Sequence, residues 1–372
     1  MDELLESLFS ACEEMSASDI HLATGLAPRF RVKGELAERG GYRPFDAKTV
    51  DAMAMELGLT TLPVGTPDGM EKVRYNLVRN GAVDGAVTSS GGMRYRFNIF
   101  REMGRTAVAL RRLDGAFRSF GELGLPPRVA DFCTERDGLV LVTGPTGSGK
   151  STTLATMLDR INSTRDGHII TIEDPVEFIH SARRCLVHQR QVGRDTRSFN
   201  DALVEALRQD PDVILVGEMR DVDTVRTALR AAETGHLVFS TLHAGDCAGA
   251  IERLVSVFPA DEQDSARHQL ALVLRGVVAQ HLLSAADGSG RVPACELLVN
   301  SVAVANLIAT GRTAQIYTML ETGAAAGMRT LDQSLAALCA TGRIREATAM
   351  ALSRNPAALQ GRLRPSRQRE AT

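Results

Sequence analysis

The chain has no tryptophan, only 4% aromatic residues, and no long hydrophobic run among its 372 residues. A helix that crosses a membrane needs about 18 or more apolar residues in a row, so no such helix is expected. The first residues are acidic and amphipathic, without the positive start and apolar stretch of a secretory signal. We therefore expect a cytoplasmic protein that is peripheral to a membrane only through its partners.

Paired cysteines and an excess of charge are also absent. None of the six cysteines forms a C-x-x-C pair, which excludes a zinc ribbon and a thioredoxin-type redox pair. The formal net charge is -2, whereas nucleic-acid-binding proteins commonly carry a basic field. We therefore expect reduced thiols and no nucleic-acid partner.

The length predicts about two domains, since a domain typically has roughly 100–200 residues. Residues 1–112 have the pattern of a small α+β domain, and residues 113–127, rich in glycine and ending in two prolines, are typical of a linker. The elements expected in the first domain are helices over residues 3–15 and 46–58, strands over 18–22 and 28–35, and an antiparallel sheet over 72–113.

Residues 128–355 have a different pattern, in which short apolar runs typical of strands buried on both faces alternate with helical segments. This alternation predicts a mainly parallel α/β sheet. The expected strands cover residues 138–143, 169–172, 213–216 and 237–240, and the helices cover 151–162, 198–208 and 221–233. We expect mostly helix after residue 245 and a disordered tail over 356–372, with a basic interaction arm as the alternative for that arginine-rich tail.

A complete phosphate-binding loop, G-x-x-x-x-G-K-S, follows the first of these strands and precedes a helix. Its glycines allow backbone N–H groups to surround an anion, and the helix directs its positive end at the phosphates. Lys150 is expected to bridge the β- and γ-phosphates and Ser151 to ligate Mg²⁺, so ATP and Mg²⁺ are the predicted ligands. The predicted nucleotide-binding residues are Gly144, Pro145, Thr146, Gly147, Ser148, Gly149, Lys150, Ser151 and Thr152.

Hydrolysis needs a carboxylate near the γ-phosphate, and two strand ends offer one. Glu173 and Glu177 follow the second strand, and Glu218 follows the third. Many P-loop proteins end the latter strand with an aspartate that binds Mg²⁺, but Gly217 stands there, so Glu218 becomes the main candidate for catalysis and for the metal. The sequence leaves open which of the three glutamates is the base.

Two histidines, His236 and His243, flank the last predicted strand. No third ligand of suitable spacing accompanies them, so a metal pair is not expected. They fit better as polar groups that sense the state of the γ-phosphate.

Four stretches together resemble the secretion ATPases, and among them the PilT-type motors of pilus retraction. They are GPTGSGKSTTLA at 144–155, ITIEDPVEFIH at 170–180, LRQDPDVILVGEMRD at 207–221 and AAETGHLVFSTLHAGD at 231–246. The family names these motifs Walker A, the Asp box, Walker B and the His box, and weaker similarity covers most of the chain.

The resemblance implies a homo-hexamer whose subunits pair a PAS-like N-terminal domain with a RecA-like P-loop ATPase core. It implies that Glu177 and Glu218 assist hydrolysis, that His236 and His243 couple the γ-phosphate to subunit contacts, and that N-terminal arginines reach the phosphates. Our candidates for those arginines are Arg96, Arg111 and Arg112. The implied function is ATP-driven retraction of a type IV pilus, at the cytoplasmic face of the inner membrane, through a membrane platform protein.

Two features of the sequence bear on the branch of the family. Pilus-assembly and type II secretion ATPases usually carry a four-cysteine metal motif, which is not in this sequence, so the retraction branch is favoured. Retraction motors typically carry an Ala-Ile-Arg-containing helix near the C-terminus, and here Ala305 stands at the arginine position. The alternatives are therefore an assembly or secretion ATPase, or a low-activity accessory paralogue that works with another pilus ATPase.

Overall fold

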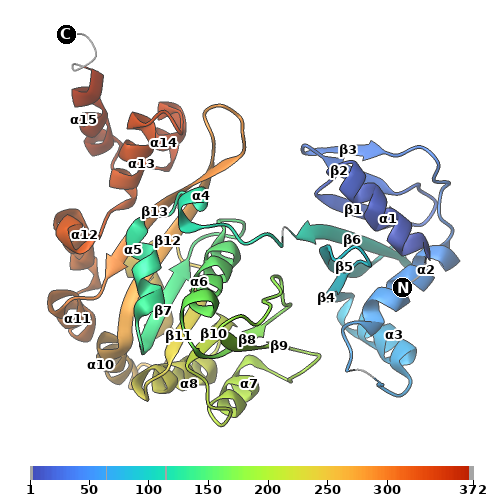
Figure 1. Ribbon diagram of the computed structural model, residues 1–372, viewed down its shortest axis with the longest axis horizontal. Helices are drawn as coiled ribbons and strands as arrows, with labels where there is room; N and C mark the ends of the chain where they lie inside the picture. The colour runs from blue at the N-terminus through green and yellow to red at the C-terminus, as the bar shows by residue number, and fades with distance from the viewer. Residues whose placement is uncertain (1–2, 64, 114, 368–372) are drawn as a thin grey trace. The chain divides into compact units, whose positions relative to one another are not determined.

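The computed structural model describes residues 3–63, 65–113 and 115–367, which form two compact units (Figure 1). The first unit comprises Met1–Ala116 together with two later segments, Ile172–Ile179 and Gln189–Ser198. The second unit comprises Phe117–Thr171, His180–His188 and Phe199–Thr372. The two late segments of the first unit were not expected from the sequence, because they are far from residues 1–116 along the chain.

The first unit contains a six-stranded sheet in the order β3-β2-β1-β6-β5-β4, and all its pairings are antiparallel. Its elements are α1 (Glu3–Glu14), β1 (Asp19–Ala23), β2 (Arg29–Val32), β3 (Glu35–Glu38), α2 (Ala47–Leu59), α3 (Gly69–Asn80), β4 (Ala82–Thr88), β5 (Arg94–Glu102) and β6 (Arg105–Leu113). This small α+β unit agrees with the fold class expected for the start of the chain.

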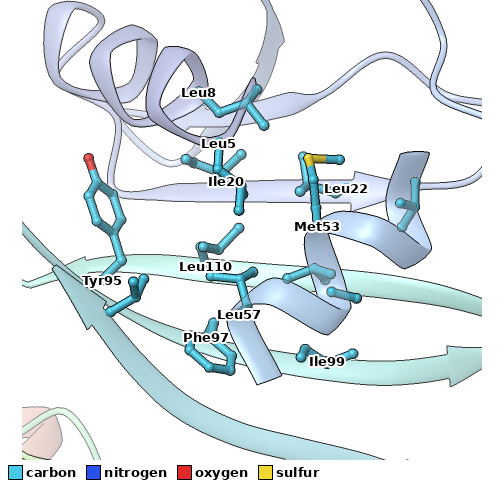
Figure 2. Packing of buried hydrophobic residues seen from close by; sticks show 14 of the residues in the cluster. Leu5, Leu8, Ile20, Leu22, Met53, Leu57, Tyr95, Phe97, Ile99 and Leu110 are labelled. Atoms are coloured by element: carbon cyan, nitrogen blue, oxygen red, sulfur yellow. The ribbon is translucent and has the colours of Figure 1, made fainter. Parts of the chain in front are cut away.

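The core of the first unit lies between this sheet and the helices α1 and α2 (Figure 2). Leu5 and Leu8 of α1 and Leu57 of α2 are almost fully buried against alternate residues of the strands. The Tyr95 ring stacks on Phe9 with centroids 4.3 Å apart, which ties β5 to α1. One face of each strand is thus buried, as the alternating pattern of the sequence predicts.

The predicted strand at the start of residues 72–113 is wrong, because residues 69–80 form the helix α3. Val73 and Leu77 are buried, whereas Tyr75 between them is 60% exposed. Residues four apart share a face of a helix, so this short apolar pattern fits a helix as well as a strand. Gly81 ends the helix in a left-handed conformation, with φ 76°.

The other sheet has seven strands in the order β13-β12-β7-β11-β10-β8-β9. Strands β12, β7, β11 and β10 run parallel, and β13 is antiparallel to β12. The elements that follow residue 116 are α4 (Phe120–Leu123), α5 (Pro127–Asp131), η1 (Phe132–Thr134), β7 (Gly138–Thr143), α6 (Lys150–Thr164), β8 (Gly167–Glu173), β9 (Cys185–Gln191), α7 (Phe199–Ala206), β10 (Val213–Glu218), α8 (Val222–Glu233), β11 (Leu237–Leu242), α9 (Cys247–Ser256), α10 (Gln263–Val273), β12 (Leu274–Ser284), β13 (Arg291–Val299), α11 (Val302–Ala309), η2 (Thr313–Gln315), α12 (Ile316–Thr322), η3 (Gly323–Ala326), α13 (Leu331–Ala340), α14 (Glu346–Leu352) and α15 (Pro356–Arg367).

Two strands and one helix after residue 245 differ from the expectation. The hairpin β12–β13 extends the sheet in a region predicted to be mostly helical, because its apolar residues pack beside β7. Residues 356–367 form α15, although a disordered tail was predicted over 356–372. Leu359 is fully buried with Leu331 and Leu335, which explains the order of this helix. Residues 368–372 lie outside the described part of the chain.

Within residues 3–63, 65–113 and 115–367, no helix combines the length and the apolar character that a membrane crossing requires.

Candidate functional site

The phosphate loop connects the carboxyl end of β7 to the first turn of α6, as its motif predicts. Gly144, Gly147 and Gly149 all have positive φ, and Gly149 is the N-cap of α6. A Cβ atom at Gly144 would lie 2.3 Å from the carbonyl oxygen of Gln280, so only glycine fits this close approach. The loop therefore presents backbone N–H groups and a helix N-terminus to the same region, which is the geometry that binds phosphate.

Three side chains of this segment fit this purpose. Lys150 is buried, and its Nζ donates hydrogen bonds to the carbonyl oxygens of Gly144 (2.9 Å) and Pro145 (3.1 Å). The Ser148 hydroxyl is buried without a hydrogen-bond partner in the structure. Ser151 lies exposed at the start of α6, where its hydroxyl is accessible to a cation.

Glu218 and His243 lie at the same edge of the sheet, because β10 and β11 are parallel neighbours and β11 is also parallel to β7 (Figure 1). Arg220 Nη2 lies 2.7 Å from one carboxylate oxygen of Glu218, and His243 Nε2 lies 3.6 Å from the other. The structure thus places Glu218 and His243 at the same edge of the sheet as the phosphate loop.

The charges around Glu218 keep its carboxylate ionised. Burial acts to raise its pKa, but the hydrogen bond and charge of Arg220, with the charges of His243 and Lys150, outweigh this and lower the pKa of Glu218 below its usual value. Burial and the Lys150 charge lower the pKa of His243 as well. At neutral pH the site therefore contains an anionic glutamate beside a neutral imidazole.

A cleft of about 280 Å³ adjoins this pair. Its polar lining includes Glu218, Arg220, His243 and Arg253, and Arg253 Nη1 donates a hydrogen bond to the carbonyl oxygen of His243 (3.2 Å). Arg220 and Arg253 were not chosen from the sequence. Arg220 could have been, because it stands two residues after Glu218, whereas Arg253 lies on α9 and only the fold brings it here.

His236 does not lie with these residues, so the two histidines that were expected to act together are at opposite ends of β11. His236 precedes β11, whereas His243 follows it, and a strand of this length separates its ends by about 20 Å. The His236 imidazole lies 2.9 Å from the carbonyl oxygen of Ala231 at the end of α8. It caps the turn between α8 and β11 at the amino edge of the sheet.

The other two candidate glutamates belong to the first unit, where they lie near arginines of β5. Arg96 Nη1 is 3.6 Å from Glu177, and Arg94 Nε donates a hydrogen bond to the carbonyl oxygen of Val176 (2.7 Å). Glu173 accepts a hydrogen bond of 3.3 Å from the Gln189 amide. Arg94 was missed by the sequence analysis, although it lies two residues before Arg96 on the same face of β5.

The three candidate arginines do not share one face of the sheet. Arg96 and Arg111 are cross-strand partners and lie on the same face, and Arg111 also pairs with Asp19 at 2.9 Å. Arg112 is paired with Tyr95, whose side chain is fully buried. Paired residues project to the same side, so Arg112 lies on the core face and differs from the expectation.

Within the described part of the chain, no group of three or more histidine, cysteine, aspartate or glutamate side chains could hold a metal ion. Mg²⁺ in nucleotide sites takes one or two protein ligands and completes its shell with phosphate and water. Ser151 and Glu218 are compatible with that limited role.

Comparisons with known proteins identify the family of the chain. The family described as type II/IV secretion system protein matches residues 1–333. The type IV pilus retraction ATPase PilT of Pseudomonas aeruginosa is 42% identical over 340 residues, which are 91% of this chain and 95% of that protein. The uncharacterized protein YggR of Escherichia coli is 40% identical over 340 residues, which are 91% of this chain and 99% of that protein.

A crystal structure of the pilus retraction motor PilT with bound ADP superposes with a TM-score of 0.85 and 42% identity, covering 96% of this chain and 98% of that one. Because it covers 96% of this chain, the likeness extends over both units. The chain has a RecA-like core preceded by a PAS-like α+β domain, and it belongs to the type II/IV secretion system protein family, among the PilT-type ATPases.

Proposed function

We propose that this chain hydrolyses ATP and uses the energy to drive retraction of a type IV pilus, as in twitching motility. The observation that carries the proposal is the complete phosphate loop beside the ionised Glu218 at one edge of the parallel sheet. The pilus role is supported by the relative from Pseudomonas aeruginosa, which is described as a type IV pilus retraction ATPase.

The triphosphate of ATP would lie in the phosphate loop. The N–H groups of the loop and the positive end of α6 attract the phosphates, and Lys150 can exchange its bonds to Gly144 and Pro145 for bonds to phosphate oxygens. The solved relative is described with bound ADP, which supports nucleotide binding by this chain. Residues 144–149, Lys150, Ser151 and Thr152 are the proposed binding segment.

We assign Ser151 and Glu218 to Mg²⁺, which when bound neutralises charge that develops on the phosphates. Glu218 can also orient water, because its carboxylate is anionic at neutral pH and hydrogen-bonded to Arg220. His243 next to it is suited to sense the γ-phosphate. Glu177 stays an alternative base, since Arg96 holds its carboxylate in a polar setting within the first unit.

The working assembly is proposed to be a homo-hexamer. In this arrangement Arg96 and Arg111, which share a face of the first unit, are the arginines best suited to contact phosphate. The hexamer would act at the cytoplasmic face of the inner membrane, on a membrane platform protein of the pilus. We propose a paralogous pilus ATPase as a further partner of the motor.

The decisive test is ATP turnover by the purified chain and its Lys150→Ala variant. Lys150→Ala removes the charge that contacts the phosphates, so turnover should fall at least about a hundredfold while the circular dichroism spectrum stays unchanged. Lys48→Ala, on α2 in the first unit, is the matched control and should keep full turnover. Turnover of the Lys150→Ala variant at the level of the unmodified chain would refute the assigned site.

A low-activity accessory role is the second candidate, and Ala305 on α11 favours it. The family arginine expected here is replaced by a methyl group on a half-buried position of this helix. The accessory role predicts that, in a strain lacking its retraction motor, the unmodified chain restores little pilus retraction and the Ala305→Arg variant restores several times more, whereas the leading proposal predicts efficient retraction by the unmodified chain. Equal, efficient retraction by both chains would exclude the accessory role.

A further inference from the structure

The strand that carries Glu218 contains a one-residue irregularity directly before it. Val216 of β10 is paired with Ser240 of β11, but the next pair joins Glu218 to Thr241. Gly217 therefore has no opposite residue on β11, which is the definition of a β-bulge. Bulges are rare between parallel strands and are over-represented next to active sites, where they redirect a side chain.

The bulge determines the face of the sheet to which Glu218 projects. In a regular strand, residues 216 and 218 would project to the same side. Here Glu218 is paired with Thr241 rather than with Leu242, the partner that a regular register would give it. Glu218 therefore shares a face of the sheet with Thr241, whereas Val216 shares the opposite face with Ser240. Glu218 thus occupies the side that residue 217 would occupy in an unbulged strand. This is how a glutamate at 218 can serve where many P-loop proteins place a strand-end aspartate one residue earlier.

A hydroxyl group of the neighbouring strand forms a hydrogen bond with the bulged residue. Thr241 is buried, and its Oγ1 donates a hydrogen bond of 2.6 Å to the carbonyl oxygen of Gly217. The Gly217 carbonyl and the Glu218 amide belong to one planar peptide group. The hydrogen bond to this carbonyl therefore fixes the orientation of the peptide group that precedes Glu218. This orientation directs the Glu218 side chain toward Arg220 and His243.

We propose that Thr241 is a positioning residue for hydrolysis, which acts by holding the Gly217 bulge and so directing Glu218 toward the phosphate loop. The inference rests on the proposed role of Glu218 in ATP hydrolysis. It assigns a structural role at the active site to Thr241, a residue of the His box other than its two histidines.

The chain contains a matched control for this hydrogen bond. Ser240, the preceding residue, is also buried, and its hydroxyl donates a hydrogen bond of 2.7 Å to the carbonyl oxygen of Val216. The two bonds join the same strands and differ in that only the Thr241 bond ends on the bulged residue. Ser240→Ala removes the regular bond, and Thr241→Val removes the bulge bond while keeping the shape of the side chain.

The test measures kcat and KM for ATP with the full chain and with five variants: T241V, T241S, S240A, E218Q and the double variant E218Q/T241V. We expect T241V to lower kcat about tenfold to a hundredfold, since a small misplacement of a reacting group has effects of this size. Its KM for ATP should change less than about twofold, because the phosphate loop is untouched. T241S, which keeps the hydroxyl, and S240A should retain most of the turnover.

The double variant separates positioning from general stability. If Thr241 acts through Glu218, E218Q/T241V should be no slower than E218Q alone, because residues that act as one unit are not additive. A T241V chain that turns over ATP as fast as S240A, or a T241S chain as slow as T241V, would overturn the proposal.

A crystal structure of the T241V chain gives a measurement that does not depend on activity. We expect Glu218 to lose its 2.7 Å contact with Arg220. An unchanged contact would refute the positioning role, whatever the turnover of the chain. If the unmodified chain did not hydrolyse ATP, the proposed function would be refuted separately.

Discussion

Single residues at the carboxyl edge of the sheet have ionisation states that suit phosphate chemistry. The Lys150 charge lowers the pKa of both Glu218 and His243, although by itself it makes up only part of each shift. A group with a lowered pKa loses its proton more readily. The glutamate is therefore anionic and the histidine is neutral at neutral pH. Arg220 is the main group that lowers the pKa of Glu218 against the opposing effect of burial, and burial is the main cause of the lowered pKa of His243, so Lys150 adds a smaller contribution to each.

His180 allows a prediction on pH dependence at the same scale. It is 9% exposed, and burial lowers its pKa to about 4, from an ordinary value near 6.5. The unfolded chain then binds a proton near pH 6.5 that the folded chain binds only near pH 4, so stability is full above pH 6.5 and falls as the pH decreases. Protonation of His180 in the unfolded chain should lower the unfolding free energy by about 2 kcal/mol as the pH falls from 7 to 5.

Denaturant titrations at both pH values measure this effect. The His180→Gln variant, which cannot ionise, should lose about 2 kcal/mol less over this interval than the unmodified chain. Identical pH profiles for His180→Gln and the unmodified chain would contradict the assigned cause.

At the scale of elements, α15 is held by tertiary packing rather than by its own helix propensity. It is a helix of 12 residues, and isolated helices of this length are marginal in water. Leu359 is fully buried in a cluster with Leu331, Leu335 and Ile344. The order of the helix therefore depends on a small number of apolar contacts with α13 and the residues after it.

Leu359→Ala tests this dependence. Removing a fully buried leucine side chain should lower the unfolding free energy of its unit by about 2–5 kcal/mol. Increased amide hydrogen exchange should be confined first to α15 and its neighbours. Gln360→Ala, at the adjacent exposed position, should change neither quantity. If the two substitutions had equal effects, the packing account of α15 would be wrong.

At the scale of the whole molecule, the proposed motor is a ring rather than a single chain. One chain has a mass of 40.0 kDa, so a hexamer should have about six times this mass in light scattering. We expect ATP with Mg²⁺ to favour the hexamer, since a ligand that binds preferentially at assembled sites shifts the equilibrium toward assembly.

Light scattering and turnover should be measured together over a range of protein concentrations. The Lys150→Ala variant should show no nucleotide-dependent increase in mass, because it is expected to bind the phosphates poorly. A monomer that hydrolyses ATP at full rate at every concentration would exclude the ring as the working form.

The sequence by itself indicated the phosphate loop, four apolar strands and their places along the chain, and Glu218 as the main candidate among three glutamates. These inferences were possible because each depends on residues that are close along the chain, where glycine content and hydrophobic period are direct signals. The same local signals were ambiguous for residues 72–80, where two buried positions four apart suit either a helix or a strand.

Only the tertiary structure decided which distant side chains meet. It separated His236 from His243 by the length of β11, placed Arg112 on the opposite face from Arg96, and brought Arg253 to the cleft beside Glu218. It also revealed that the bulge at Gly217 determines the face of Glu218. Strand register and bulges depend on pairing between residues far apart in the chain, and no local pattern of the sequence specifies them.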